Sequence, residues 1–405
     1  MPKSLVRGAA LILMTLSACR PATTTDLPTL VAAQPTLSPT PAPTTTPTRR
    51  APVLPPTFTP THTATATPTQ DQVGTPTPPG FRPQGTIFYL YNGDAIVALD
   101  PQSGDERVVM QFGMGQRLAD LAASPDGALL AFTAPSINAS REAHVMNRDG
   151  SYVQQISCLR FPELRLPRWT PDGATLVFFA AQTAQGQGNL FRADVAGAGN
   201  CPQDNRQGLL VDDPLSRVSG LIYDDTRRLW IVADEQGIAA YGPQSDGRTL
   251  LVPRNDFGPQ ARLGLSASRA ALSYIAIVPA VGGFTTEARL LVFAAGLPSE
   301  PQEGSTLLKD ALDMLWHPRA ERALIVGREV LALAEVRGSL RLLDVGRLRD
   351  AVAAFSPDGR RIVYSALDES GVIQLYVLAL DEPSARPRQL TRHVEGSVDE
   401  LLWLP

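Results

Sequence analysis

Short apolar bursts recur along residues 85–405, and each burst follows a compact polar turn. In the three clearest copies the turn has the sequence Ser/Thr-Pro-Asp-Gly, at positions 124–127, 170–173 and 356–359. The residues that follow align without gaps as Leu130-Ala131-Phe132, Leu176-Val177-Phe178 and Ile362-Val363-Tyr364. Each burst is too short for a helix and is rich in aromatic and β-branched residues, so the pattern predicts β-strands joined by tight turns.

The composition of the turn explains its geometry. Proline presets φ at the first central position, aspartate accepts local backbone hydrogen bonds, and glycine takes the positive φ that closes a hairpin. Because the same carboxylates recur in turn after turn, we assign them a structural rather than a catalytic role. The structural turn residues are Asp126, Gly127, Asp172, Gly173, Asp358 and Gly359.

An aligned column just before each turn sets the length of the repeat. Its members are Ala123, Trp169, Tyr223, Leu265, Trp316, Phe355 and Trp403. They are separated by six intervals of roughly 47 residues, close to the length of a four-stranded propeller blade. We expect the five aromatic members to pack between neighbouring blades. The alternative is a ring of aromatic side chains at one mouth of the channel, available to ligands such as sugars.

The ends of the repeat predict how the ring closes. Three strand-like runs, 85–91, 95–100 and 106–110, lack an innermost strand, whereas residues 397–405 resemble an innermost strand with nothing after it. Joining them in one composite blade removes exposed strand edges. The sequence therefore predicts an all-β propeller of seven four-stranded blades, closed by pairing of the C-terminal strand with the N-terminal strands. Six blades is the alternative, if one degenerate unit is an insertion.

The turn and the strand after it resemble the WD40-like (PD40) repeat of TolB-type propellers. The resemblance is carried by Ser-Pro-Asp-Gly at 356–359, by the strand at 361–365 and by the ending Arg388-Gln389-Leu390-Thr391. It covers about residues 85–405 and implies a β-propeller over that range. We find no counterpart of the α/β domain that precedes the propeller in TolB, which weakens any transfer of TolB's role in the Tol–Pal system.

Residues 1–19 have the features of a lipoprotein signal peptide. Lys3 and Arg7 give a basic start, and the apolar stretch over 8–16 is too short to span a membrane as a mature helix. The segment ends in Leu-Ser-Ala-Cys at 16–19, which matches the lipobox of bacterial lipoproteins. We expect lipidation of Cys19 to anchor the chain to a membrane of the cell envelope, with the propeller outside the cytoplasm. An ordinary signal peptide that happens to precede a cysteine is the alternative.

Residues 20–84 differ in composition from the rest of the chain. Of these 65 residues, 19 are Thr and 16 are Pro. Apolar runs are absent, so we expect a disordered linker. Proline keeps such a chain extended at about 3.1 Å per residue, which gives a reach of roughly 200 Å. We interpret the segment as a spacer between membrane and propeller; a ligand role for the Pro-rich stretch is the alternative.

Cys158 and Cys201 are the two cysteines of the predicted propeller. A location outside the cytoplasm permits disulfides. Closing a loop of about 43 residues would stabilise the fold by roughly 4 kcal/mol in the chain-entropy model. We predict a disulfide between them, and two free buried thiols are the alternative.

Charge and motifs argue against several function classes. The net charge is −4, and no basic cluster with interleaved aromatic residues suggests nucleic-acid binding. We find no Gly-x-Ser-x-Gly elbow, His-Glu-x-x-His motif, P-loop or EF-hand loop. His144, His317 and His393 fall in different predicted blades, so we expect no metal site. We predict no cofactor and name no catalytic residue.

We expect the propeller to be a monomeric binding module for a protein, peptide or cell-wall ligand. Segments 182–189, 196–207, 279–286 and 296–304 depart from the repeat, and propellers bind through loops and the axial funnel because the blades supply a rigid frame. An enzyme, either a lyase or a hydrolase acting on cell-surface polysaccharide, is the alternative. It would need ionisable side chains converging in the funnel. A structural envelope protein without a small ligand is the third hypothesis.

Overall fold

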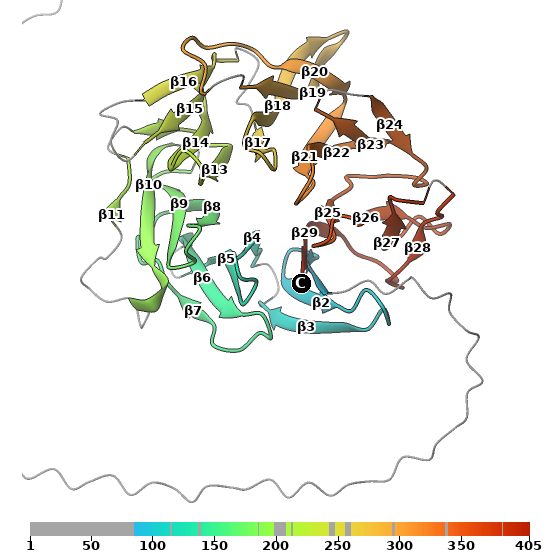
Figure 1. Ribbon diagram of the computed structural model, residues 1–405. Helices are drawn as coiled ribbons and strands as arrows, with labels where there is room; N and C mark the ends of the chain where they lie inside the picture. Colours follow the sequence, from blue (N-terminus) through green and yellow to red (C-terminus); the bar gives the residue numbers. More distant parts are fainter. Residues whose placement is uncertain are drawn as a thin grey trace, which may run out of the picture. The chain divides into compact units, whose positions relative to one another are not determined.

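The computed structural model describes residues 85–113, 116–136, 139–184, 186–197, 208–211, 214–242, 248–255, 261–293, 296–336, 339–382 and 384–405. These residues form an all-β propeller of seven blades around one axis (Figure 1). The predicted fold class and the preferred blade number are confirmed, and the six-bladed alternative is wrong. Cys19, the signal segment and the linker over 20–84 lie outside the described residues.

We number the blades 1 to 7 in chain order and name the strands of each blade A to D from the axis outward. Blade 1 contains β29 (Val398–Leu404), β1 (Thr86–Tyr91), β2 (Ala95–Leu99) and β3 (Glu106–Gln111). Blade 2 contains β4 (Ala119–Ala123), β5 (Leu129–Pro135), β6 (Arg141–Asn147) and β7 (Gln154–Gln155). Blade 3 contains β8 (Glu163–Trp169), β9 (Thr175–Ala181), β10 (Gln187–Asp194) and β11 (Gly208–Leu209), with a short 3₁₀ helix η2 (Val195–Gly197) and with β12 (Leu215–Ser216) paired to β10.

Blades 4 to 7 repeat the same antiparallel order. Blade 4 contains β13 (Gly220–Asp224), β14 (Leu229–Asp234), β15 (Gly237–Tyr241) and β16 (Arg248–Val252). Blade 5 contains β17 (Ala261–Leu265), β18 (Ala271–Ala280), β19 (Gly283–Val292) and β20 (Ser305–Lys309). Blade 6 contains β21 (Ala311–Trp316), β22 (Arg322–Gly327), β23 (Leu331–Glu335) and β24 (Leu340–Leu343). Blade 7 contains β25 (Ala353–Phe355), β26 (Arg361–Leu367), β27 (Ile373–Ala379) and β28 (Arg388–Gln389).

The C-terminal strand closes the ring as predicted. β29 pairs antiparallel with β1, so that Trp403 lies opposite Ile87. Side chains reinforce the seam between blades 7 and 1, where the hydroxyl of Tyr89 donates to Glu106 and His393 Nε2 lies 3.0 Å from Glu106 Oε1. The two ends of the propeller chain thus share one four-stranded sheet, in which β29 is the innermost strand.

The hydrophobic core lies between blades and is divided into one cluster per interface. Each of the seven clusters draws residues from two adjacent blades, including the pair formed by blades 7 and 1. Apolar residues of the B and C strands supply most of this surface, because both faces of these strands are covered. None of the described residues forms a helix that is long and apolar enough to cross a membrane.

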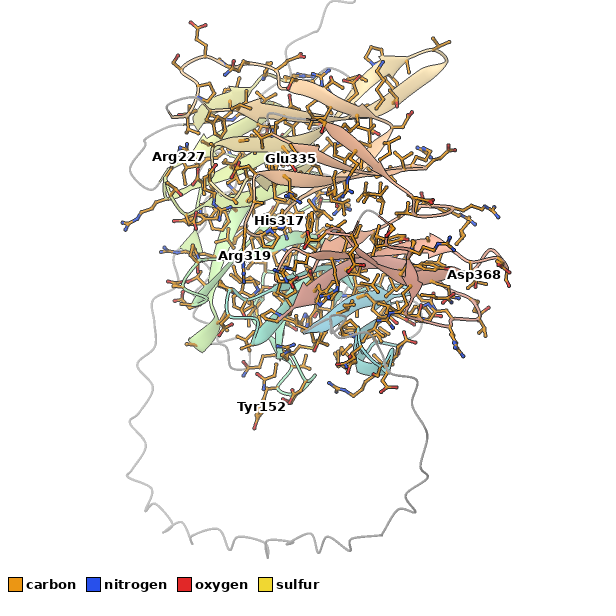
Figure 2. All side chains as sticks on the ribbon, turned by 45° about the vertical axis from the view of Figure 1, so that its right-hand side comes forward. Tyr152, Arg227, His317, Arg319, Glu335 and Asp368 are labelled. Atoms are coloured by element: carbon orange, nitrogen blue, oxygen red, sulfur yellow. The ribbon has the colours of Figure 1, made fainter. Side chains whose placement is uncertain are left out.

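Antiparallel order gives the propeller two distinct faces. A–B and C–D turns gather on one face, which we call the repeat face because it carries the Ser/Thr-Pro-Asp-Gly turns. B–C turns and the connections from strand D to the next strand A gather on the other, which we call the mouth face. Figure 2 shows Asp368, in a B–C turn, at the right of the view and Arg227, in an A–B turn, at the left.

Two of the segments that depart from the repeat are shorter as loops than expected. Residues 279–286, which depart from the repeat, extend β18 and β19 and leave a two-residue turn at Val281-Gly282. The β-branched residues Ile277 and Val278 of β18 pair with Thr286 and Thr285 of β19, which favours this extension of the ladder. Likewise, β10 begins at Gln187 and takes up the end of the expected loop 182–189.

Candidate functional site

The turn aspartates lie on the repeat face and bond within their own turns. Asp126, Asp172 and Asp358 each accept a hydroxyl hydrogen bond at 2.6 Å from the Ser or Thr two residues earlier. Each also accepts the backbone N–H two residues later, at 3.0, 3.0 and 3.1 Å respectively. These hydrogen bonds hold the pKa values of the three carboxyls below their usual range, although partial burial opposes the effect at Asp358.

The turn glycines adopt the left-handed conformation that the motif requires. The φ angles of Gly127, Gly173 and Gly359 are 70°, 67° and 76°. A Cβ at Gly359 would lie 2.0 Å from His317 Nε2 of the preceding blade, whereas one at Gly173 would approach only Pro125, at 3.6 Å. These turns therefore contact the neighbouring blades on the repeat face.

The aromatic column lies at the interfaces between blades. The indole N–H of Trp169 donates to the carbonyl of Ala122 in blade 2 at 3.3 Å, and that of Trp316 donates to Ser273 Oγ in blade 5 at 2.9 Å. Phe355 and Trp403 are buried in the clusters on either side of blade 7. Tyr223 is half-buried, with its ring centroid 4.8 Å from that of Trp230.

Cys158 is disulfide-bonded. Its partner is not among the described residues, and both other cysteines of the chain, Cys19 and Cys201, lie outside them. The pairing of Cys158 with Cys201 therefore stays a prediction. Cys158 follows β7, which is the outermost strand of blade 2.

Five charged side chains from five blades converge on the propeller axis. This axial cluster consists of Asp120, Arg168, Arg262, Asp313 and Glu400, which lie in the A strands β4, β8, β17, β21 and β29. The other four residues of the cluster all act on the pKa of Arg168. Because screening limits such interactions to about 10 Å, the side chains from blades 1, 2, 5 and 6 lie within that range of Arg168 in blade 3.

The residues of the axial cluster lie at or next to β-bulges in their strands. The register of strand A against strand B shifts between Ala119 and Ala122 in blade 2, and between Ala261 and Gly264 in blade 5. Asp120 and Arg262 lie inside these bulges with φ angles of 59° and 54°. The registers of β8, β21 and β29 also shift, next to Arg168, Asp313 and Glu400. Bulges re-aim side chains, so they account for the convergence.

Glu400 is held by the backbone of the neighbouring blade. Its Oε1 accepts the N–H of Asp120 at 2.7 Å, and its Oε2 accepts the N–H of Leu121 at 2.5 Å. Burial and the charge of Asp120 raise the pKa of Glu400 to about 7, against the opposing effect of these two bonds and of Arg262. Glu400 can therefore gain or lose a proton near neutral pH.

Asp313 and Arg168 complete the cluster from opposite sides of the ring. Burial raises the pKa of Asp313, while Arg262 and Arg168 lower it in part. Asp313 Oδ1 accepts the N–H of Met314 at 2.7 Å. Burial also lowers the pKa of Arg168, whose guanidinium donates to the carbonyls of Leu221 and Pro167 at 3.1 and 3.0 Å. The axis thus holds both signs of charge, with Arg262 exposed and the other four side chains partly buried.

A hollow of about 660 Å³ opens on the mouth face and reaches the axial cluster at Arg262 and Asp313. The connections into blade 7 and blade 1 form its walls, at residues 349–352 and 394–399. The B–C turn of blade 7 adds Leu367 and residues 371–373. We call this feature the mouth hollow. It combines a rigid frame of A strands with loops that differ from blade to blade.

The histidines do not join the axial cluster. The ring of His144 stacks on Phe132 with centroids 5.4 Å apart, and His317 packs against Phe355 of the next blade at 5.3 Å. His393 lies at the seam between blades 7 and 1. Across the described ranges, no group of three or more His, Cys, Asp or Glu residues is placed to hold a metal ion.

Comparison with known proteins finds similarity in solved structures. No family model and no curated protein matches the sequence. TolB from Acinetobacter baumannii is similar with 15% identity and a TM-score of 0.47; the alignment covers 79% of this chain and 66% of TolB. A prolyl endopeptidase has 13% identity and a TM-score of 0.51, with 78% of this chain and 49% of that enzyme covered. This chain therefore spans about two thirds of TolB and half of the endopeptidase.

A third structure matches over its whole length. It is a protein from Bacteroides uniformis named for 6-phosphogluconolactonase activity, with 10% identity, a TM-score of 0.51, and coverage of 80% of this chain and 100% of that one. At these identities the matches show the propeller fold alone. That fold agrees with the resemblance to TolB-type propellers that the repeat predicted.

The axial cluster was missed at the level of sequence, although the repeat contained a signal for it. Asp120, Arg262, Asp313 and Glu400 all lie three residues before the aligned column that includes the blade aromatics. A charged residue at this position, three residues before the aromatic column, interrupts a largely apolar strand, and that interruption is the signal in the sequence. Arg168 lies one residue before the column, so alignment alone would not have joined it to the others.

Proposed function

We propose that this chain is a membrane-anchored lipoprotein whose propeller binds a ligand in the mouth hollow, outside the cytoplasm. The hollow carries the proposal: its volume of about 660 Å³ falls in the range of small-molecule and peptide-side-chain sites. Its walls present charged groups over a partly apolar floor. Ligand sites favour this combination, because apolar area supplies affinity and a few polar groups fix orientation.

The anchoring part of the proposal rests on the sequence. Lipidation of Cys19 would supply several acyl chains, each CH₂ contributing about 0.8 kcal/mol, which is sufficient for stable attachment. The Thr/Pro-rich segment 20–84 would then hold the propeller away from the membrane. Partitioning of the protein into detergent tests this part: Cys19→Ser should move it to the aqueous phase, and unchanged partitioning would contradict lipid anchoring.

Photo-crosslinking in intact cells tests the location of the site. A photoreactive phenylalanine analogue replaces Val394, which is 87% exposed in the wall of the mouth hollow, or Tyr152, which is 82% exposed. Tyr152 lies in a C–D turn of the repeat face and projects away from blade 2 (Figure 2). We expect a discrete crosslinked product, whether protein, peptide or cell-wall fragment, from position 394 only. Capture at position 152 with none at 394 would contradict the proposal.

An enzyme acting on cell-surface polysaccharide is the second candidate, and the axial cluster favours it. Two carboxyls with raised pKa values, Asp313 and Glu400, lie near the axis. Perturbed carboxyls in a cleft are the groups that general acid–base catalysis uses. If the propeller is a lyase or hydrolase, the purified chain will release unsaturated or reducing ends from cell-surface polysaccharide. Asp313→Asn and Glu400→Gln would abolish that release, while Asp381→Asn on the repeat face would not.

A further inference from the structure

We propose that the mouth hollow selects a ligand bearing an alkylammonium group, such as a lysine side chain of a peptide or a free diamine. This inference rests on the proposed function of the hollow and specifies the chemistry of its ligand. It follows from three properties of the lining: the balance of its charges, the state of pairing of its carboxylates and the apolar surface beneath them.

Carboxylates outnumber cations in the lining. Asp313, Asp350, Glu395 and Asp399 line the hollow, against two arginines, Arg262 and Arg349. The whole chain is nearly balanced, with 40 acidic and 36 basic residues, so the excess is local. A concave surface concentrates this field and attracts the opposite charge.

Three of these four carboxylates form no salt bridge with another described residue. Asp399 is 3.5 Å from Arg117. Over the described residues, no salt bridge involves Asp313, Asp350 or Glu395, although Arg262 acts on Asp313 from a longer distance. Asp313 lines the hollow and is partly buried, and the one hydrogen bond that its side chain accepts from a described residue comes from the adjacent backbone N–H of Met314. Arg262 and Arg168 act on Asp313 from beyond salt-bridge distance, and an incoming ammonium would give this carboxylate a direct ion-pair partner.

The surface between the charges is apolar. Leu312, Val352, Val372, Ile373 and Val398 contribute to the lining. Four of these five residues are half-buried rather than fully covered, so they retain surface that a ligand can bury. A lysine side chain or a diamine matches this arrangement, because its methylene stem packs on apolar groups while its ammonium reaches the carboxylates.

The two arginines limit what else the ligand can carry. Arg262 approaches the hollow from blade 5 and Arg349 from the connection into blade 7. They suit a carbonyl or carboxylate on the same ligand, as a peptide would provide. A purely anionic ligand would face the four carboxylates at close range, and like charges disfavour such binding. The charge balance therefore favours a cationic ligand over an anionic one.

Calorimetric titration of the full chain in detergent tests the inference with four probes. The probes are N-acetyl-Gly-Lys-Gly-amide, the same peptide with the lysine Nε acetylated, N-acetyl-Gly-Glu-Gly-amide, and cadaverine. We expect the lysine peptide to bind at least about tenfold more tightly than the acetylated and glutamate peptides. Comparison with cadaverine distinguishes the sources: tighter binding of the peptide indicates a peptide ligand, and tighter binding of cadaverine indicates a free amine.

Variants test whether the preference for an amine arises from the carboxylates of the mouth hollow. The double variant Asp313→Asn/Glu395→Gln should weaken binding of the preferred amine about tenfold or more, whereas Asp381→Asn, an exposed carboxylate on the repeat face, should leave it unchanged. Thermal melting of each variant shows whether it is folded. If Asp313→Asn/Glu395→Gln lowers the melting temperature, Glu395→Gln alone, which changes a surface side chain, serves in its place.

The outcomes separate this inference from the proposed function. Tighter binding of the acetylated or glutamate peptide, or no binding of either amine, overturns the alkylammonium preference. If Val394 still captures a ligand in cells under that outcome, the hollow remains a binding site for a ligand of other chemistry. Loss of both probe binding and capture at Val394 overturns both.

Discussion

Carboxylates on the repeat face and near the propeller axis are perturbed in opposite directions. Hydroxyl and backbone donors hold the pKa values of Asp126, Asp172 and Asp358 below their usual range. Burial instead raises the pKa values of Asp313 and Glu400. At the turns the donors outweigh burial and favour the charged form, whereas near the axis burial outweighs the hydrogen bonds and arginines that oppose it. The first kind therefore belongs to the scaffold, and the second kind marks the candidate site.

Removing β29 should have the largest effect, because this strand serves both regions. It supplies strand A of blade 1, buries Val398, Leu401 and Trp403, and carries Glu400. We expect a chain ending at Ser397 to lose cooperative thermal unfolding, measured by circular dichroism. Deleting eight residues from the segment 20–84 is the control and should leave melting unchanged. A truncated chain that melts cooperatively at the wild-type temperature would show that closure contributes little.

Glu400→Gln should change how the free energy of unfolding depends on pH, because Glu400 has a raised pKa, unlike the turn carboxyls. The folded-state pKa of Glu400 is about 7, raised from 4.5, so folding favours the protonated form. Its contribution to stability is fully present below pH 4.5 and is lost as the pH rises through 7, a change of about 3 kcal/mol. Urea unfolding of both proteins between pH 4 and 8 should show wild type losing stability relative to the variant across this window.

A matched substitution checks that pH effect. Glu329 is exposed on the surface of blade 6, and Glu329→Gln should change stability little at any pH in the range. If the difference between wild type and Glu400→Gln is the same at pH 4 and pH 8, Glu400 is not the buried, titrating group described above.

Substituting turn glycines should give a smaller effect that depends on the neighbouring blade. Gly359→Ala and Gly173→Ala both place alanine at a positive φ, which costs about 1 kcal/mol. Only Gly359→Ala also forces a Cβ against the ring of His317, so we expect a total loss of about 2 kcal/mol there. Equal losses of unfolding free energy in urea would argue against contact between the turns of blades 6 and 7.

The repeat predicted the scaffold because its signal is local and periodic. Turn residues such as Asp358 and Gly359 act within a few positions of themselves, and the apolar columns recur with every blade. Ring closure could also be predicted, since the missing strand A before Thr86 and the strand-like segment 397–405 complement each other. The extension of β18 and β19 was not predicted, because a departure from the repeat does not say whether the extra residues form a loop or lengthen a hairpin around Val281-Gly282.

The candidate site was less predictable because it depends on contacts across the ring. Asp120 and Arg262 are separated by more than two blades of sequence, and only the closed propeller and its bulges bring their side chains together. The walls of the mouth hollow come from connections of unequal length, such as 394–397, that the repeat does not describe. A residue like Asp313 can be noticed as a charge in an apolar strand, but its neighbours cannot be named from the sequence.

The most direct test compares Asp358→Ala with Asp313→Ala in two measurements on the same preparations: unfolding free energy in urea, and ligand capture by the photoreactive group at position 394. Loss of the bonds from Ser356 and Arg360 should cost Asp358→Ala about 1 kcal/mol and leave capture unchanged. Asp313→Ala should keep or increase stability and reduce capture. The opposite pattern, in which Asp358→Ala loses capture and Asp313→Ala loses stability, would contradict the account. It would mean that the repeat face is not scaffold and that the mouth face does not bind the ligand.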